Sequence, residues 1–167
     1  MNGLRLAKIQ DLPEIMDVVI DAQEFLKSQD SGQWQDGTPS IATIAEDSTN
    51  GRFYVWEEDE KIVGIIALLD HDADYDNLVS GKWRFSGPYI VIHRFAVRSE
   101  YHSPGIAIKM LKAVEEIAKE RNIETIRIDT HEKNTPMISL LLKNGFQECG
   151  KVLIEKTKSR ITFDKSI

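Results

Sequence analysis

The segment that most constrains the fold of this chain is a strand, a loop, a helix and a second strand between residues 88 and 130. Residues 88–97 are rich in β-branched and aromatic side chains, which predicts a long strand. Residues 104–121 carry apolar side chains at helical spacing, and residues 123–130 predict another strand. Two strands joined by one helix lie parallel in the same sheet. We therefore expect an α/β protein.

The remaining segments add antiparallel strands and further helices. Residues 52–57 and 61–69 predict two strands joined by a tight acidic turn, and hence a hairpin. A helix is expected to begin after Asp11, whose side chain can cap it. Further strands are expected at 4–7, 146–154 and 160–163, further helices at 40–47 and 135–144, and irregular chain at 28–39 and 70–88. These elements predict a mixed, mostly antiparallel sheet with helices on both faces.

Size and charge exclude several classes of protein. A chain of 167 residues predicts a single domain, residues 1–167. It has 21 Lys and Arg against 27 Asp and Glu, and this net charge of −6 disfavours binding to nucleic acid. The charge is −10 in residues 1–92 and +4 in residues 93–167. The one cysteine, Cys149, excludes an internal disulfide and a cysteine-rich zinc site. No apolar run has the length of a membrane helix, and no signal peptide is present, so we expect a cytoplasmic protein without a membrane partner.

The loop before the helix at 104–121 has the composition of a phosphate site. Gly105 allows a phosphate to approach the backbone closely, and the N–H groups and dipole at a helix start attract anions. A simpler interpretation also stands, because Ser103 is a good helix cap and Pro104 a good first residue. The loop alone leaves both interpretations open.

The order of motifs from this strand onward resembles one family of enzymes. Its pattern is a strand ending in a small residue and Val, a Gln/Arg-x-x-Gly-x-Gly/Ala helix start, a strand, an Asn, and a short helix ending in Gly-Phe. The corresponding residues are Ala96-Val97, His102 to Ala107, Ile126 to Thr130, Asn134 and Gly145-Phe146. The chain therefore resembles the GNAT superfamily of N-acetyltransferases. The likeness extends to small bacterial members of unassigned substrate through Gln33-Trp34, Ile92-His93-Arg94 and Asp129-Thr130-His131.

The resemblance implies a GNAT-like fold and acetyl coenzyme A as the co-substrate. It implies that backbone N–H groups of residues 102–107 hold the pyrophosphate. It also implies that the parallel strands splay apart where the pantetheine arm pairs with the strand end. The residues implied to bind the cofactor are Phe95, Ala96, Val97, His102, Ser103, Gly105, Ile106, Ala107, Asn134 and Lys143. For Lys143, a solvated helix end is an equal alternative. No metal site is expected.

Three residues depart from the family pattern. His102 stands where the family has Gln or Arg, and it is a weaker cation at neutral pH. Pro104 has no N–H and so removes one donor. Leu141 stands where many members have a tyrosine that protonates the departing thiolate. The resemblance therefore supports cofactor binding better than catalytic competence.

Two histidines are candidates for the general base that acetyl transfer to an amine needs. His93 lies on the long strand, and His131 follows the strand at 123–130, at the sheet edge where α/β proteins bind ligands. Each has a structural alternative: His93 as a hydrogen-bonded core residue, and His131 with Asp129 as a cap of the next turn. Residues 70–76 alternate Asp with other residues, but they lack the Gly and Glu of a calcium loop.

The resemblance, together with the two histidine candidates, implies an N-acetyltransferase that moves an acetyl group from acetyl coenzyme A to a primary amine of a small molecule or peptide. The acidic residues 1–92 suit a cationic acceptor. The alternative, which Leu141 favours, is a non-enzymatic acyl coenzyme A-binding or regulatory module. A nucleoside-phosphate binder is a third interpretation, but the loop lacks a Lys-Ser/Thr pair. A homodimer is compatible with the sequence, which does not define the assembly.

Overall fold

The structure is a computed structural model that describes residues 2–102 and 105–167. The chain forms two compact units, Met1–Leu68 with Arg94–Ala113, and Leu69–His93 with Val114–Ile167. Strand β5 (Tyr89–Val97) and helix α3 (Ile106–Glu120) contribute residues to both, because the unit boundaries fall inside these two elements.

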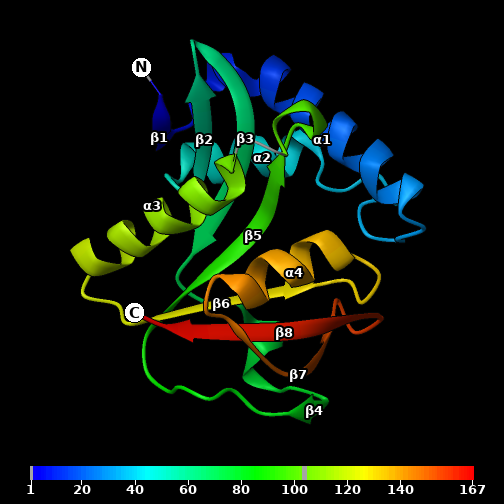
Figure 1. Cartoon of the computed structure of the whole chain (residues 1–167), viewed down its shortest axis with the longest axis vertical. Helices are drawn as coiled ribbons and strands as arrows, with labels where there is room; N and C mark the ends of the chain where they lie inside the picture. The colour runs from blue at the N-terminus through cyan, green and yellow to red at the C-terminus, as the bar shows by residue number, and fades with distance from the viewer. Residues whose placement is uncertain (1, 103–104) are drawn as a thin grey trace. The chain divides into compact units, whose positions relative to one another are not determined.

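The first unit holds the N-terminal strands and helices. Its strands follow the order β1-β2-β3, and the end of β5 comes next (Figure 1). Asp59 and Glu60 join β2 to β3 with φ values of 49° and 67°, as a two-residue hairpin turn of this hand requires. The elements are β1 (Gly3–Leu6), η1 (Ile9–Asp11), α1 (Leu12–Ser28), α2 (Ile41–Thr49), β2 (Phe53–Glu58), β3 (Lys61–Leu69) and η3 (Ser99–Tyr101).

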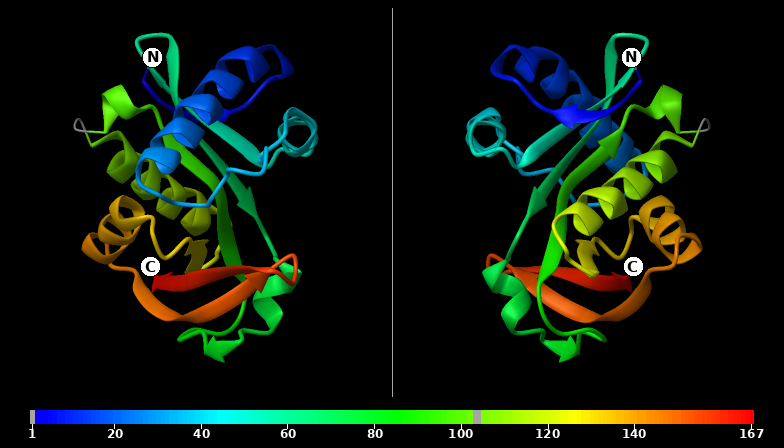
Figure 2. Two further views of the ribbon diagram at one scale, coloured as in Figure 1. Left: turned by 90° about the vertical axis from the view of Figure 1, so that its right-hand side faces the viewer. Right: turned by 90° about the vertical axis from the view of Figure 1, so that its left-hand side faces the viewer.

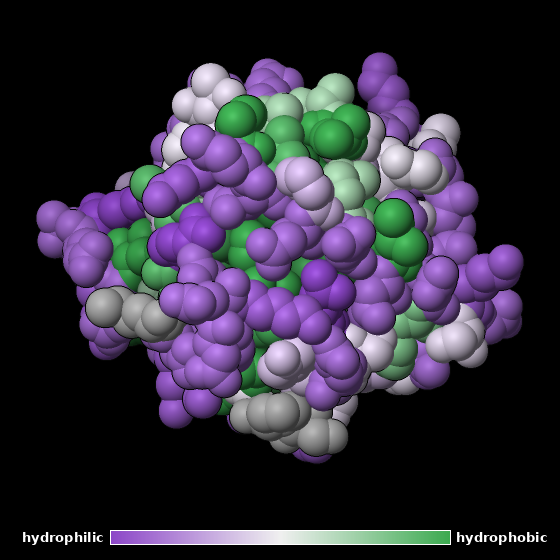
Figure 3. Space-filling view, turned by 90° about the horizontal axis from the view of Figure 1, so that it is seen from above, coloured by the Kyte–Doolittle hydropathy of each residue, from purple (hydrophilic) through white to green (hydrophobic). Residues whose placement is uncertain are grey.

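Strand β3 forms the centre of the first unit, since its residues 62–68 are all buried. Gly64 lets the start of α3 pack closely on this strand, because a Cβ here would lie 2.7 Å from Met110 Sδ. The Glu14 carboxylate of α1 accepts the backbone N–H of Ile62 at 3.1 Å. Helix α1 buries the face formed by Ile15, Val18, Val19, Ala22 and Leu26. The face shown in Figure 3 carries apolar side chains in several separate groups among polar ones.

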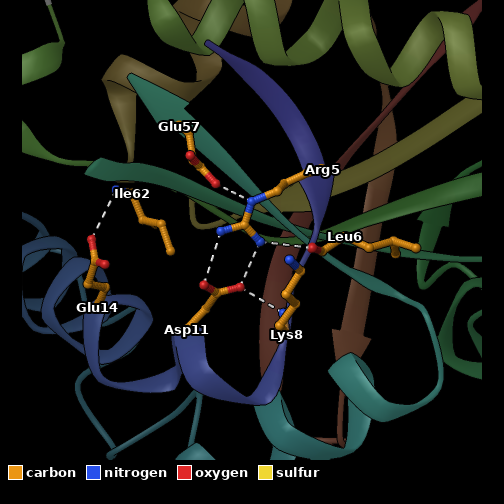
Figure 4. A network of polar contacts seen from close by, with 7 residues as sticks. All are labelled: Arg5, Leu6, Lys8, Asp11, Glu14, Glu57 and Ile62. Carbon is orange, nitrogen blue, oxygen red and sulfur yellow. Dashed lines mark hydrogen bonds and ion pairs between the residues drawn. The ribbon is translucent and has the colours of Figure 1, made fainter. Parts of the chain in front are cut away.

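Arg5 on β1 joins three elements of the first unit (Figure 4). Its guanidinium donates to both carboxylate oxygens of Asp11, at 2.7 and 3.0 Å, and to Glu57 on β2. Asp11 also accepts the backbone N–H of Lys8 at 2.7 Å. The expectation that the Asp11 side chain caps α1 is wrong: within the described chain it makes no such bond, because Arg5 and Lys8 engage its oxygens.

The second unit holds the parallel strand pair. Its strands follow the order β5-β6-β8-β7-β4. Strands β5 and β6 run parallel, from Tyr89 opposite Thr125 to Ile92 opposite Ile128, and the other pairs are antiparallel. The other elements are η2 (Ala73–Asp76), β4 (Ser80–Gly81), β6 (Thr125–Thr130), α4 (Thr135–Lys143), β7 (Gln147–Ile154) and β8 (Lys158–Ser166).

The two faces of the second unit's sheet are covered differently, with α4 on one side and η2 on the other (Figure 2). On the η2 side, the guanidinium of Arg127 lies between the rings of Trp83 and Tyr89, 4.3 and 4.0 Å from their centroids. The segment between β3 and β5 therefore packs on the sheet face to which Tyr89 and Arg127 point. A buried cluster on this side consists of Tyr75, Tyr89, Val91 and Val152.

The expected fold class is confirmed: the described residues form a mixed α/β structure of eight strands and four α-helices, mostly antiparallel, with one parallel pair. Two details differ from the sequence analysis. Residues 70–88, expected to be irregular, contain η2 and β4. Strand β8 runs for 9 residues, beyond the expected 160–163, because β6 and β7 on its two sides supply backbone partners that its charged ends do not reveal.

Candidate cofactor and catalytic sites

The loop after β5 is a compact turn anchored on α1. The backbone N–H of Arg98 donates to Val63 O on β3 at 2.8 Å. The N–H and hydroxyl of Ser99 both donate to Asp21 on α1, at 2.8 and 2.9 Å. The turn η3 begins at Ser99. These contacts fix the path of the chain from β5 toward α3.

His102 closes this turn. Its Nε2 donates to Val97 O at 2.8 Å, since a carbonyl only accepts, and its ring lies edge-on to Phe25 with centroids 4.9 Å apart. Its backbone N–H donates to Ser99 O at 3.2 Å. The resemblance assigned this N–H to the pyrophosphate, but it already has a partner, so the N–H groups on offer in the described chain begin at Gly105. Ser103, also expected in this site, lies outside the described residues.

The start of α3 has the features of an anion cradle. Gly105 has a φ of 77°, and no heavy atom of the described residues outside its chain neighbours lies within 4 Å of a Cβ placed there. Lys109 N donates to Gly105 O at 3.1 Å. Ile106 and Ala107 lie in the first turn of α3, where backbone N–H groups have no acceptor four residues back within the helix, and the helix dipole adds positive potential. This open backbone fits a pyrophosphate group.

Strand β5 is irregular just before Phe95. Arg94 has a φ of 51°, which a regular strand does not tolerate. Its guanidinium lies 3.1 Å from Asp47 of α2, and Arg52 lies 3.2 Å from the same carboxylate. The Asp47 side chain is only 6% exposed, so α2 holds the irregular point of β5 through a largely buried ion pair. Phe95 and Val97, expected to pair with the cofactor, follow this point and are buried, and Ala96 lies between them.

His93 has a carboxylate partner in the second unit. Its Nε2 lies 2.7 Å from Oδ2 of Asp72, and the two side chains are 23% and 15% exposed. Burial alone would raise the pKa of Asp72, but the hydrogen bond and charge of His93 and the N–H of Asp74 lower it. The structure therefore places the strand histidine in a hydrogen-bonded, partly buried acid–base pair.

A second polar pair lies beside His93. The hydroxyl of Tyr75 donates to Asp129 Oδ2 at 2.5 Å, and the rings of Tyr75 and His93 have centroids 6.0 Å apart. Burial and the Asp129 charge raise the pKa of Tyr75. Burial likewise raises the pKa of Asp129, against the opposing influence of His93 and Tyr75. Tyr75 is fully buried, so it holds Asp129 rather than serving as an acid.

His131 differs from His93 in its surroundings. Its Nδ1 accepts the backbone N–H of Lys133 at 3.1 Å, and its carbonyl accepts the N–H of Asn134 at 2.9 Å. Burial, with Arg160 and Lys133, lowers its pKa. His131 thus shapes the turn into α4, whereas Asp129, expected to share that role, binds Tyr75 instead.

The α4 residues have structural roles at its two ends. Asn134 is the buried N-cap, and its Oδ1 accepts the N–H of Met137 at 3.4 Å. Lys143 is exposed in the last turn. Leu141, at the position of the family tyrosine, is fully buried.

The acidic segment 70–76 is a folded turn. Asp72 caps η2 through the N–H of Asp74 at 2.9 Å, and Asp76 pairs with His71 at 2.9 Å.

Across the described residues, no three His, Cys, Asp or Glu side chains are grouped to hold a metal ion. No helix in residues 2–102 and 105–167 has the length and apolarity to span a membrane. The sequence did not identify Asp72, Tyr75 and Asp129 as neighbours of His93, because the alternating Asp pattern gives no sign of which carboxylate meets the strand.

The fold is that of an α/β protein whose parallel strands β5 and β6 are joined through α3, and the backbone at the start of this helix has the features of an anion site. Residues 19–146 match the model of the acetyltransferase (GNAT) family. This match covers more than half of the chain, which therefore belongs to the GNAT acetyltransferase family. Members of this family transfer acetyl groups from acetyl coenzyme A. A comparison with proteins of curated function finds no match.

Solved structures of the same fold support this assignment. A GNAT family acetyltransferase from Streptococcus agalactiae is 31% identical, with a TM-score of 0.90, covering 99% of this chain and 95% of that chain. A GNAT family acetyltransferase from Listeria monocytogenes is 21% identical, with a TM-score of 0.74 and coverages of 99% and 95%. The PaiA N-acetyltransferase from Thermoplasma acidophilum, solved in complex with coenzyme A, is 18% identical, with a TM-score of 0.76 and coverages of 100% and 99%.

Proposed function

We propose that this protein transfers the acetyl group of acetyl coenzyme A to a primary amine of a small molecule or peptide. The observation that carries the proposal is the position of His93 on β5. It has a carboxylate partner, and it lies two residues before the segment Phe95–Val97 assigned to the pantetheine arm. The Thermoplasma protein of the same fold is an N-acetyltransferase, which supports nitrogen as the acceptor atom.

The residues of the chain have distinct parts in this proposal. Backbone N–H groups of Gly105, Ile106 and Ala107, together with Ser103 of the loop, hold the pyrophosphate, and His102 shapes this loop through its bonds to Val97 O and Ser99 O. Phe95, Ala96 and Val97 align the pantetheine arm, with Asn134 and Lys143 as further contacts. When bound, acetyl coenzyme A supplies a thioester whose carbonyl carbon accepts the amine. Holding the two reactants together supplies much of the rate enhancement.

His93 is the proposed base. The acceptor nitrogen must lose a proton as the C–N bond forms and the C–S bond breaks, and neutral His93 takes this proton. The thiolate leaves with the electron pair of the C–S bond, and water protonates it, because Leu141 offers no acid. His131 is the less favoured candidate, since its Nδ1 already accepts a backbone N–H.

The proposal is tested by release of free thiol from acetyl coenzyme A across a panel of small amines and peptide N-termini. We expect at least one amine to be acetylated, and we expect His93→Gln to lower kcat by about 10²- to 10⁴-fold. His131→Gln is the matched control and should retain more activity. Binding of acetyl coenzyme A without thiol release from any amine would favour the regulatory module, for which the buried Leu141 is the supporting observation.

A further inference from the structure

Asp72 is held at both of its carboxylate oxygens. Oδ1 accepts the backbone N–H of Asp74 at 2.9 Å at the start of η2, and Oδ2 faces Nε2 of His93 at 2.7 Å. The backbone N–H of Asp72 donates to the hydroxyl of Tyr89 at 3.4 Å, and Tyr89 lies four residues before His93 on β5. The carboxylate is therefore fixed relative to both the turn and the strand.

The charge of Asp72 determines which nitrogen of His93 carries a proton. The pKa of Asp72 is lowered, although burial opposes this, so the carboxyl group is ionised at neutral pH. An ionised carboxylate only accepts hydrogen bonds. Nε2 of His93 therefore donates, and in the neutral ring Nδ1 keeps its lone pair.

The turn that presents Asp72 is itself anchored. Tyr75 is fully buried, its hydroxyl donates to Asp129, and its carbonyl accepts the indole N–H of Trp83 at 2.9 Å. Asp74 accepts the backbone N–H of Glu155 at 3.2 Å. An orienting group is effective when its neighbours fix its own position. Asp72 meets this condition.

A second histidine–aspartate pair in the same turn provides an internal comparison. His71 and Asp76 lie 2.9 Å apart, but their side chains are 57% and 53% exposed. Exposed pairs of this kind contribute little, because water competes for both partners. The two pairs share their chemistry and differ in burial and in their attachment to β5.

We propose that Asp72 is a positioning residue for acetyl transfer, which holds the His93 ring by Nε2 and leaves Nδ1 to take the proton from the acceptor amine. This inference rests on the function proposed above. Asp72 takes no proton itself. Its charge stabilises the imidazolium that forms when the amine nitrogen gives its proton to Nδ1.

The hydrogen bond is tested first by proton NMR, which does not depend on activity. An imidazole N–H bonded to a carboxylate gives a downfield resonance that exchanges slowly with water. We expect this resonance in the wild-type protein and in Asp76→Asn, and its loss in Asp72→Ala and His93→Gln. Should Asp72→Ala fail to fold, Asp72→Asn serves, because a neutral amide moves the resonance upfield. A resonance absent from the wild type, or unchanged in the Asp72 variants, would overturn the inference.

The positioning role is tested by kinetics with the same variants. Asp72→Asn keeps the shape of the side chain, and we expect kcat to fall by about 10- to 100-fold. We expect the KM for acetyl coenzyme A to stay within about twofold, because a purely structural defect would change both. Asp76→Asn should match the wild type. An unchanged kcat in Asp72→Asn overturns the inference. A wild-type protein inactive on every amine overturns the proposed function instead, and the NMR result then decides whether Asp72 holds the ring.

Discussion

Asp47 and Asp164 show how single residues of this chain carry buried negative charge. Asp47 lies between Arg52 and Arg94, and the fully buried Asp164 accepts Arg84 Nε at 2.7 Å. Burying a carboxylate is costly unless a cation and hydrogen bonds compensate it, and removing the cation leaves the cost in place. Each of these two carboxylates therefore depends on its arginine partners.

In the Arg5–Asp11 pair, the dependence of a carboxylate on its arginine partner can be measured by varying the pH. The hydrogen bond from Arg5 lowers the pKa of Asp11 below its ordinary 3.8, against the effect of burial. The pair therefore stabilises the fold above that value, and the stabilisation is lost as pH falls through the lower, folded-state pKa. We expect Arg5→Met to lower the free energy of unfolding by about 1 kcal/mol at neutral pH, since Arg5 is 33% exposed.

Urea unfolding across the pH range checks this prediction. The difference between wild type and Arg5→Met should shrink as the pH falls through the lowered, folded-state pKa of Asp11, because below it Asp11 is protonated in both states. Lys27→Met, at an exposed position on α1, is the control and should change stability little at any pH. A deficit that stays constant down to acid pH would show that Arg5 acts through packing alone.

At the scale of elements, the sequence predicted the helices, strands and turns whose position is set by their own residues. The hairpin at Asp59–Glu60 and the helix ending at Gly145 have local sequence signals. The elements that depend on distant partners have no local sequence signal. Strand β4 consists of two residues that pair with β7, and η2 is held by Asp72 and Asp129. Likewise, His93 was a candidate because of its strand, but Asp72 lies 21 residues earlier among similar aspartates. Only the fold selects the one that meets His93.

The pairing of β4 with β7 depends on two glycines that face each other. A Cβ on Gly150 would lie 2.0 Å from the carbonyl oxygen of Ser80, so the backbones approach more closely than any side chain allows. We expect Gly150→Ala to displace β4 and lower the free energy of unfolding by about 1–3 kcal/mol. Hydrogen exchange should accelerate at Val79 and Lys82, whose N–H groups donate to β7. Lys151→Ala, an exposed neighbour on the same strand, is the control; equal exchange rates in both variants would contradict the prediction.

For the whole molecule, membership of a family that uses acetyl coenzyme A predicts that this ligand stabilises the folded protein. A ligand that binds only the folded protein raises the free energy of unfolding by mass action, by about 2.7 kcal/mol at 100 times its Kd. For a protein of this size, that corresponds to a rise in Tm of about 5–10 °C. We expect acetyl coenzyme A to produce a shift of this order, measured by thermal unfolding.

The cradle at Gly105 makes this shift specific. Gly105→Glu places a negative side chain where the pyrophosphate binds, so the shift should vanish. Gly105→Ala is the matched control: it forces the same positive φ of 77° on a residue with a Cβ, but the space around it is open. Both variants should therefore lose similar stability without ligand, because both strain the backbone equally. Only the alanine variant should recover stability with acetyl coenzyme A. Loss of the shift in both would mean that the backbone strain or the Cβ alone, rather than the negative charge, prevents binding, and a shift retained in Gly105→Glu would place the pyrophosphate elsewhere.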